Sequence, residues 1–339
     1  MQATLSESKV LLDGKLEGYG REVEDKTELS LEEAAFLLER GKIEVLEDGE
    51  SLGFENYFEK ASKISKEFAQ RYLVYKNLRE RGYFIQPGAI DFRLYSRGEK
   101  SGESEAFVWV VSEREPVPLA EMIKNITAAA NVKKTLLFAI VDEESDITFY
   151  EAKETKFPEK KNAVVGVDPN GSATLLDEGV IVWSPETARA LHENGFFGRY
   201  EGEGDRLLLS FVETSYLMKS GVLEVADRNG RKLDIEYFVK YSEKVEDEFL
   251  RKYRIYEDMR NRGLVVKTGF KFGSHFRVYD KFPEKHSKYL VHAVPLAHVF
   301  SLQELSRAVR LAHTVRKRML FGYEEGGEMK YVDIGRVKP

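Results

Sequence analysis

The sequence predicts an α+β protein in which one unit occurs twice in tandem. Three observations support this fold class. Four motifs recur in the same order in the two halves of the chain. Stretches with helical apolar spacing end at glycines, and short apolar runs of strand length follow them. Each unit should therefore have a helical or mixed N-terminal part and a C-terminal part that combines a mixed sheet with helices.

The clearest repeat pairs Tyr72–Gly82 with Tyr253–Gly263, in which both tyrosines, both arginines and the final glycine coincide. The other repeated pairs are residues 30–41 with 210–221, Phe92–Tyr95 with Phe276–Tyr279, and Val132–Phe138 with Val315–Phe321. A single match could arise by chance. Four matches in one order, at a nearly constant offset, indicate internal duplication.

The elements of each copy follow from local signals. Ser30 and Ser210 each begin a Ser-x-x-Glu capping box ahead of an apolar helical stretch. The next helix of each copy ends at Gly82 or Gly263, where glycine favours termination. We place the first unit at residues 1–160 and the second at 161–339, with a polar linker over 157–162.

The C-terminal part of each copy combines strands with one more helix. Phe276–Tyr279 and Tyr289–Val294 have the length and composition of strands. In the second copy a helix is expected from Ser301, with a buried stripe of Leu305, Val309, Ala312 and Val315. In the first copy the runs Leu136–Val141 and Ile147–Ala152 predict a closing hairpin.

Composition limits the function classes. The chain has 339 residues, a net charge of -6 and no cysteine, so disulfides, thiolate metal sites and cysteine nucleophiles are excluded. No N-terminal signal segment is evident, and the longest apolar runs, such as Leu136–Val141, are far below the roughly 18 residues of a membrane span. We therefore expect a cytoplasmic protein.

The net charge is not that of a general nucleic-acid binder, so any RNA contact must use a local patch. Basic residues gather near the end of the chain, where they could equally be solvated faces of a helix and a tail. They are Arg307, Arg310, Arg316, Lys317, Arg318, Arg336 and Lys338.

The two copies differ at positions that could carry chemistry. Aligned second-copy and first-copy residues are Tyr279 and Tyr95, His286 and Glu103, Lys317 and Lys134, Arg310 and Thr127, and Arg336 and Lys153. The second copy therefore combines Tyr, His and Lys with two arginines. The first copy keeps Tyr and Lys but lacks the histidine.

Tyr, His and Lys together suit metal-independent cleavage of RNA by its own 2′-hydroxyl. His286 could act as acid or base near neutral pH, and Lys317 could stabilise charge on the phosphorus. Tyr279 is a poor base unless positive charge lies nearby. Each residue also has a purely structural interpretation, and His275 and His292 compete with His286 on residue type alone.

The motifs also resemble those of a known family, the archaeal tRNA-splicing endonucleases in their homodimeric two-unit form. The resemblance is densest from Tyr253 to Phe321, where it includes residues 263–274, Phe276–Tyr279, 286–291 and 307–319, and it extends more weakly over nearly the whole chain. It implies a nuclease-like C-terminal part in each unit. The implied substrate is precursor tRNA with a bulge-helix-bulge, cut to 2′,3′-cyclic phosphate and 5′-hydroxyl ends without a cofactor.

The resemblance also implies roles for individual residues. Tyr279 would be the general base, His286 the general acid and Lys317 the transition-state stabiliser. Arg310 and Arg336 would hold a bulged base between their guanidinium planes, which is physically reasonable for an unpaired base.

For the first unit the resemblance implies a catalytically inactive structural copy. Its acidic hairpin loop would dock on the partner chain of a homodimer. The residues implied are Asp142, Glu143, Glu144 and Asp146. From the residues alone, this loop could also be an ordinary solvated turn.

Two other classes stay open at this point. The chain could be a non-catalytic RNA-binding subunit, although the complete Tyr, His and Lys set of the second copy argues against this. A metal-dependent nuclease is the other alternative, but no clear carboxylate pair with a lysine is evident. A phosphate-binding Gly-x-x-x-x-Gly-Lys-Ser/Thr loop and a Gly-x-Ser-x-Gly elbow are both absent from the sequence.

Overall fold

A computed structural model describes residues 1–98, 102–158, 171–202, 205–280 and 286–339. The chain forms two compact units. Unit 1 comprises Met1–Glu154, Val299–Arg307 and Ile334–Pro339, and unit 2 comprises Thr155–His298 and Ala308–Asp333. The expected boundary between residues 160 and 161 lies outside the described residues.

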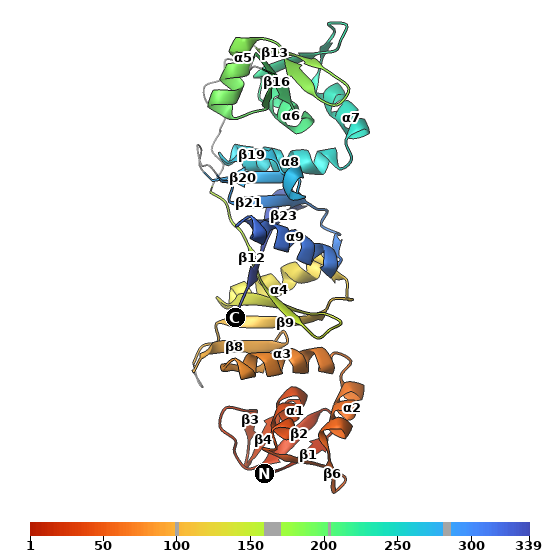
Figure 1. The fold of residues 1–339 in the computed structure, drawn as a ribbon, viewed down its shortest axis with the longest axis vertical. Coiled ribbons are helices and arrows are strands. Elements are labelled where there is room, and N and C mark those ends of the chain that lie inside the picture. Colours follow the sequence, from red (N-terminus) through yellow and green to blue (C-terminus); the bar gives the residue numbers. More distant parts are fainter. Residues whose placement is uncertain (99–101, 159–170, 203–204, 281–285) are drawn as a thin grey trace. The chain divides into compact units, whose positions relative to one another are not determined.

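The N-terminal part of unit 1 is a six-stranded sheet in the order β3-β4-β2-β1-β5-β6, with helices α1 and α2 (Figure 1). Strand β1 is antiparallel to β2 and parallel to β5, so the chain crosses over between β1 and β5 by way of α1. The elements are β1 (Gln2–Ser6), β2 (Lys9–Asp13), β3 (Arg21–Val23), β4 (Lys26–Leu29), α1 (Leu31–Glu39), β5 (Glu44–Glu47), β6 (Glu50–Leu52) and α2 (Phe54–Ile64).

Unit 2 begins with the same sheet, in the order β15-β16-β14-β13-β17-β18. Here β13 is antiparallel to β14 and parallel to β17, which repeats the pairing of unit 1. The elements are β13 (Gly171–Leu175), β14 (Val180–Val182), α5 (Pro185–Arg189), β15 (Arg199–Glu201), β16 (Arg206–Leu209), α6 (Phe211–Lys219), β17 (Leu223–Ala226), β18 (Lys232–Leu233) and α7 (Ile235–Val245). A π-helical turn, Ala190–Asn194, follows α5.

Matching caps explain why α1 and α6 begin where they do. Glu33 and Glu213 each close a capping box with the serine three residues earlier. The second oxygen of each carboxylate accepts a hydrogen bond from the backbone N–H of Gly20 or Gly198, at 2.9 and 2.8 Å. Both glycines have φ near +60°, and a Cβ there would lie only 2.5 or 2.6 Å from a backbone oxygen of the neighbouring strand.

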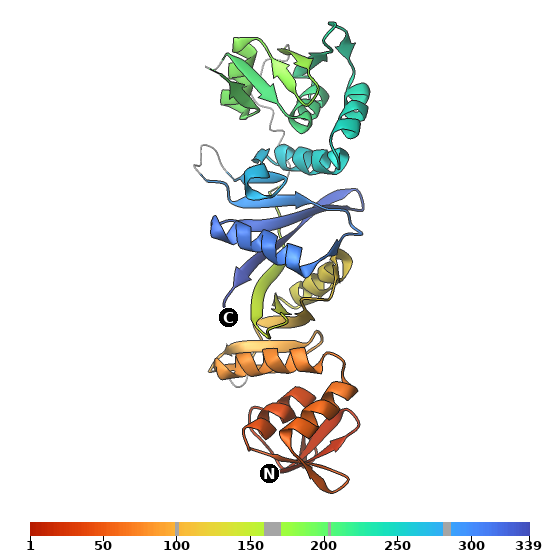
Figure 2. The same cartoon turned by 45° about the vertical axis from the view of Figure 1, so that its right-hand side comes forward.

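The C-terminal part of unit 1 contains five neighbouring strands in the order β12-β11-β9-β8-β7. Helix α3 packs against β7, β9 and β11 (Figure 2), and α4 packs against β11 and β12. The elements are α3 (Phe68–Glu80), β7 (Tyr83–Pro87), β8 (Phe92–Arg97), β9 (Ala106–Ser112), β10 (Val117–Pro118), α4 (Leu119–Asn131), β11 (Thr135–Val141) and β12 (Ile147–Glu154). The predicted hairpin of β11 and β12 is confirmed.

Unit 2 repeats this part with strands in the order β19-β20-β21-β23-β24, and α8 packs against β19, β21 and β23. The elements of the second copy are α8 (Phe249–Asn261), β19 (Val265–Thr268), a 3-10 turn (Phe270–Phe272), β20 (Phe276–Tyr279), β21 (Tyr289–Ala293), β22 (Val299–Phe300), α9 (Leu302–Thr314), β23 (Arg318–Glu325) and β24 (Glu328–Val337). Of these, β22, the first part of α9 and the end of β24 fall in the segments assigned to unit 1. Tandem duplication in a mixed α+β fold is therefore confirmed.

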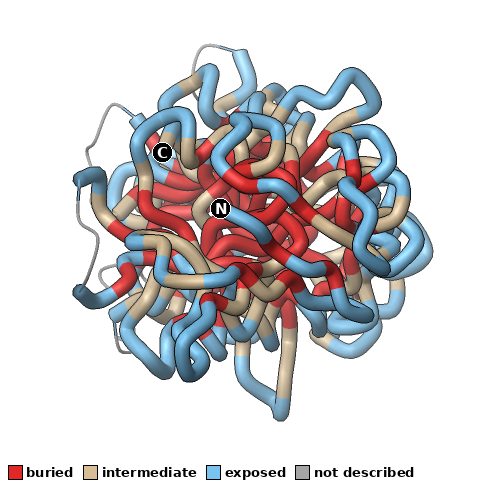
Figure 3. The backbone as a smooth tube through the Cα atoms, turned by 90° about the horizontal axis from the view of Figure 1, so that it is seen from below, coloured by how far each residue is buried: buried red, intermediate tan, exposed pale blue. Residues whose placement is uncertain are grey.

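Each unit has a continuous apolar core of buried residues, and Figure 3 colours the backbone by burial, with the buried residues in red. Tyr75 of α3 and Tyr256 of α8 occupy equivalent core positions and are fully buried. The expected stripe on α9 is buried at Leu305, Val309 and Ala312, whereas Val315 follows the last residue of the helix and is only half-buried. None of the helices in the described residues is long and apolar enough to cross a membrane.

Candidate active site

Strand register places the ends of three strands of unit 2 at one edge of the sheet. Tyr279 is the last residue of β20. Val278 pairs with Tyr289 across the antiparallel strands β20 and β21. Tyr289 in turn lies beside Arg318 in the parallel pair of β21 and β23. The end of β20 and the beginnings of β21 and β23 therefore meet at this edge.

His286 belongs to the connection between β20 and β21 and reaches the same edge. The backbone N–H of Lys288 donates to the carbonyl of Val278, at 2.9 Å. The Lys288 ammonium also pairs with Asp280 at 2.7 Å, which ties the two ends of the connection together. His286 is exposed, and residues 281–285 are not described.

A specific helix end positions Lys317. After α9, Arg316 adopts a left-handed conformation with φ 56°. The backbone N–H of Lys317 then donates to the carbonyl of Ala312 at 2.8 Å. This hydrogen bond closes the helix and turns the chain, so that Lys317 directly precedes β23 and its side chain is half-buried at the same edge.

Positive charge gathers around these groups. The Lys317 ammonium lies 5.9 Å from the ring centroid of Phe272, and the Arg277 guanidinium lies 5.9 Å from that of Tyr279. Burial and the nearby charge of Arg277 lower the pKa of Lys317 from its ordinary value. No sequence motif marks Arg277 as functional, although its place two residues before Tyr279 puts both side chains on one face of the strand.

The equivalent edge of unit 1 shows how close these positions are. Glu103, the counterpart of His286, forms an ion pair with Lys134, the counterpart of Lys317, at 3.5 Å. The hydroxyl of Tyr95, the counterpart of Tyr279, donates to the side-chain oxygen of Gln86 at 3.1 Å. In unit 1 the same three positions therefore hold groups that are engaged with one another or with the strand beside them.

The two candidate base-binding arginines belong to different compact units. Arg310 lies on α9 in unit 2, and Arg336 lies near the end of β24 in the segment that belongs to unit 1. Both side chains are exposed. The geometry of a clamp between them stays a prediction.

The acidic loop of unit 1 is the turn between β11 and β12. The carboxylate of Asp142 accepts hydrogen bonds from the backbone N–H groups of Glu144 and Asp146, at 3.0 and 2.8 Å. Glu143 forms an exposed ion pair with Arg114 at 3.0 Å. Asp142 thus shapes the turn, while the other three acidic side chains face solvent.

The competing histidines have structural roles. His275 precedes β20, at the opposite end of that strand from Tyr279, and its Nδ1 accepts a hydrogen bond from the N–H of Ala293 at 3.0 Å. Its ring contacts His292, which stacks on Phe321. Burial lowers the pKa of His275 to about 4 and also lowers that of His292. Both are therefore neutral packing groups at neutral pH.

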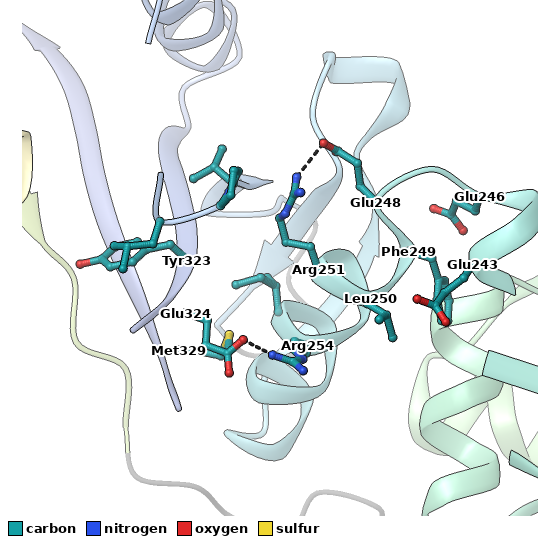
Figure 4. A pocket seen from close by; sticks show the side chains of 14 residues that line it. Glu243, Glu246, Glu248, Phe249, Leu250, Arg251, Arg254, Tyr323, Glu324 and Met329 are labelled. Atoms are coloured by element: carbon teal, nitrogen blue, oxygen red, sulfur yellow. Dashed lines mark hydrogen bonds and ion pairs between the residues drawn. The ribbon is translucent and has the colours of Figure 1, made fainter. Parts of the chain in front are cut away.

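A pocket of about 470 Å³ in unit 2 lies away from this edge (Figure 4). It is lined by Tyr323 and Glu324 near the end of β23, whereas Lys317 precedes the start of that strand. Several carboxylates line it, and Glu248 and Glu324 pair there with Arg251 and Arg254. An acidic wall does not suit a polyanion such as RNA. Among the described residues, no three His, Asp or Glu side chains gather to hold a metal ion.

Family comparisons identify both parts of each unit. The tRNA intron endonuclease catalytic C-terminal domain matches residues 68–149 and again 249–331. The tRNA intron endonuclease N-terminal domain matches residues 1–58 and 171–239. Each domain type therefore occurs twice, in agreement with the repeated sheets.

Full-length relatives show the same relationship. The chain is 44% identical to a tRNA-splicing endonuclease of Methanococcoides burtonii over 351 aligned positions, covering 100% of both proteins. It is 47% identical to the tRNA-splicing endonuclease of Methanosarcina mazei, covering 94% of this chain and 92% of the relative. It is also 47% identical to that of Methanosarcina acetivorans, covering 94% and 93%. The chain therefore belongs to the tRNA intron endonuclease family, the endoribonucleases of tRNA splicing.

Proposed function

We propose that this chain cuts precursor tRNA at the exon–intron junctions of a bulge-helix-bulge, with catalysis in residues 161–339. Residues 1–160 then form a structural, inactive copy. The observation that carries this proposal is the edge of the unit 2 sheet, where strand register gathers the positions of Tyr279, His286 and Lys317. At the same edge of unit 1, Glu103 replaces the histidine.

The proposed reaction is attack of the 2′-hydroxyl on the adjacent phosphate. Tyr279, as its phenolate, accepts the 2′ proton, and His286, as its imidazolium, donates a proton to the departing 5′-oxygen. Lys317 stabilises the added negative charge on the pentacoordinate phosphorus. The products are a 2′,3′-cyclic phosphate and a 5′-hydroxyl, and no step requires a metal ion or other cofactor.

RNA binding is assigned to Arg310 and Arg336. Both guanidinium groups are exposed, and Arg310 aligns with an uncharged threonine, Thr127, in the inactive copy. In the proposed complex the two planar groups stack on either side of a bulged base. Such stacking reads an unpaired base by its shape and exposure, not through a Watson–Crick partner.

The active form is proposed to be a homodimer in the cytoplasm. Asp142 fixes the backbone of the acidic turn, so the carboxylates of Glu143, Glu144 and Asp146 are presented to solvent. A rigid turn with exposed acidic groups suits docking on a basic surface of the partner chain. Each dimer then has two active sites, one in each catalytic unit.

The direct test uses a labelled bulge-helix-bulge RNA in excess EDTA, beside the same RNA with a 2′-deoxy nucleotide at each cleavage position. The expected result is cleavage of the first RNA at both bulges, with cyclic phosphate ends, and no cleavage of the second. Cleavage that returns only with added metal would favour a metal-dependent nuclease. Binding without cleavage under either condition would favour a non-catalytic subunit.

A further inference from the structure

Arg277 of β20 lies beside two of the proposed catalytic groups. It precedes Tyr279 by two residues, so the two side chains project from the same face of the strand. The guanidinium carbon is 5.9 Å from the centroid of the Tyr279 ring. Its charge also reaches Lys317 and contributes to the lowered pKa of that ammonium. Arg277 is therefore close to both Tyr279 and Lys317.

The charge of Arg277 lacks a protein counterion among the described residues. Its Nε is buried and has no hydrogen-bond partner there, and no carboxylate in this part of the chain forms an ion pair with its guanidinium. The neighbouring cation Lys267 donates to the carbonyl of Gly198 at 2.8 Å, so it adds positive charge rather than neutralising it. A half-buried guanidinium without an ion pair destabilises the folded protein unless an anion binds it.

The matching position in unit 1 lacks these features. Arg93, the counterpart of Arg277, is exposed. The lysine at that edge, Lys134, already pairs with Glu103. In the part of the chain that the structure describes, only unit 2 therefore combines a half-buried arginine at this position with a lysine that has no such ion pair. If Arg277 only supported the fold, the structural copy would be expected to bury its arginine equally.

We propose that Arg277 is a further catalytic residue, which donates hydrogen bonds to a non-bridging oxygen of the scissile phosphate beside Lys317. This inference rests on the proposed function. The guanidinium keeps all its protons throughout the reaction. As the 2′-oxygen bonds to phosphorus and the 5′-oxygen leaves, negative charge grows on the non-bridging oxygens, and Arg277 binds this charge more tightly than that of the ground state.

The first experiment measures single-turnover cleavage of bulge-helix-bulge RNA by Arg277→Met, with Arg93→Met as the matched control. Methionine retains much of the aliphatic packing but removes the donors. We expect a rate loss of about 10²–10³-fold for Arg277→Met, the usual effect of removing one such donor. We expect Arg93→Met to cleave at the wild-type rate. Equal rates for wild type and Arg277→Met would overturn the inference.

The second experiment separates a catalytic contact from a structural one. Each non-bridging oxygen of the scissile phosphate is replaced in turn by sulfur, a weaker hydrogen-bond acceptor. One of the two sulfur substitutions should lower the cleavage rate of the wild type. The ratio of the rates with oxygen and with sulfur, here called the sulfur effect, should be smaller in Arg277→Lys and should be one in Arg277→Met. An unchanged sulfur effect in Arg277→Lys would show that Arg277 does not contact the phosphate, even if Arg277→Met fails to fold.

The two proposals fail in different ways. If the wild-type chain does not cut the RNA in EDTA, the proposed function is wrong and the role of Arg277 falls with it. If the wild type cuts but its sulfur effects do not depend on residue 277, only the present inference is wrong.

Discussion

Units 1 and 2 share the same strand orders, the capping boxes of α1 and α6 and the glycines that follow α3 and α8, yet they differ at one edge of the sheet. In unit 1, Glu103 neutralises Lys134 through an ion pair. In unit 2, His286 takes the place of the acidic residue, and Lys317 has Arg277 as its charged neighbour. Among the described residues, the lysine of unit 1 therefore has an acidic partner at this edge, whereas the proposed role of Lys317 is to bind a phosphate.

At a second pair of equivalent positions, the two units use different side chains, Asp91 and His275, to accept the same backbone hydrogen bond. The carboxylate of Asp91 accepts a hydrogen bond from the N–H of Val110 at 2.7 Å. At the equivalent place in unit 2, the ring nitrogen of His275 accepts one from the N–H of Ala293 at 3.0 Å. Both side chains accept a hydrogen bond from the equivalent backbone N–H. Acidification should affect stability in opposite directions at the two positions, because folding raises the pKa of Asp91 and lowers that of His275.

The largest expected effect is that of removing the proposed acid. His286→Ala should lower single-turnover cleavage by about 10²–10⁴-fold, the contribution typical of general acid catalysis. Glu103→Ala, at the matched position of unit 1, should leave the rate within about twofold, because no step there requires it. A gel-based cleavage assay measures both, and a comparable loss in Glu103→Ala would remove the distinction between the units.

Removal of the lysine should have the next effect. Lys317→Ala should lower the cleavage rate by about 10²–10³-fold, because the charge that stabilises the transition state is lost. Lys134→Ala breaks only an exposed ion pair at 3.5 Å and should not change the rate. The same assay tests both variants, and full activity in Lys317→Ala would contradict its proposed role.

The free energy of unfolding should also respond differently to substitutions at one pair of equivalent positions in the two units. Asp258 is buried and accepts hydrogen bonds from Arg262 at 2.8 Å and Tyr331 at 2.7 Å. Asp258→Ala should lower the free energy of unfolding by about 3 kcal/mol, because a charged partner is left without its acceptor. In unit 1 the equivalent residue is Asn77, and Asn77→Ala should cost less. Urea unfolding measures both, and equal losses would contradict this explanation.

As the pH falls, the free energy of unfolding of unit 2 should decrease before that of unit 1. The pKa of buried His275 is lowered to about 4, below its ordinary value near 6.5, so the unfolded state binds the proton first as the pH falls. From pH 7 to pH 5 this group should lower the free energy of unfolding of unit 2 by about 2 kcal/mol. Burial raises the pKa of Asp91, whose proton uptake in the folded state opposes acid unfolding of unit 1.

Hydrogen exchange at pH 7 and pH 5 can locate this effect within the chain. Protection of the amides of β20 and β21 should fall more than that of β8 and β9. His275→Gln, which retains an acceptor but does not titrate, should remove most of the difference. Equal losses of protection in both pairs of strands would show that His275 does not control acid sensitivity.

Much of this architecture could be predicted from the sequence because its signals are local or repeated. The capping boxes, the glycine helix ends and the hairpin of β11 and β12 depend on neighbouring residues. The strands of the two N-terminal sheets were harder to predict individually, because most have only three to five residues. Their pairing is set by contacts between segments far apart in the chain.

The site was predictable in residue type but not in spatial arrangement. Aligning the copies singled out Tyr279, His286 and Lys317, but strand register was needed to place their positions at one edge. Arg277 gave no signal, because Arg93 stands at the matching position. Only the structure shows that one arginine is half-buried and the other exposed.

The central claim is that catalysis belongs to unit 2 alone. The most direct test compares two triple variants for cleavage of bulge-helix-bulge RNA in EDTA. One carries Tyr279→Phe, His286→Ala and Lys317→Ala, and the other carries Tyr95→Phe, Glu103→Ala and Lys134→Ala. We predict that the first binds the RNA without cutting it and that the second cuts at the wild-type rate. Loss of cleavage in the second variant, with its fold intact, would contradict the account.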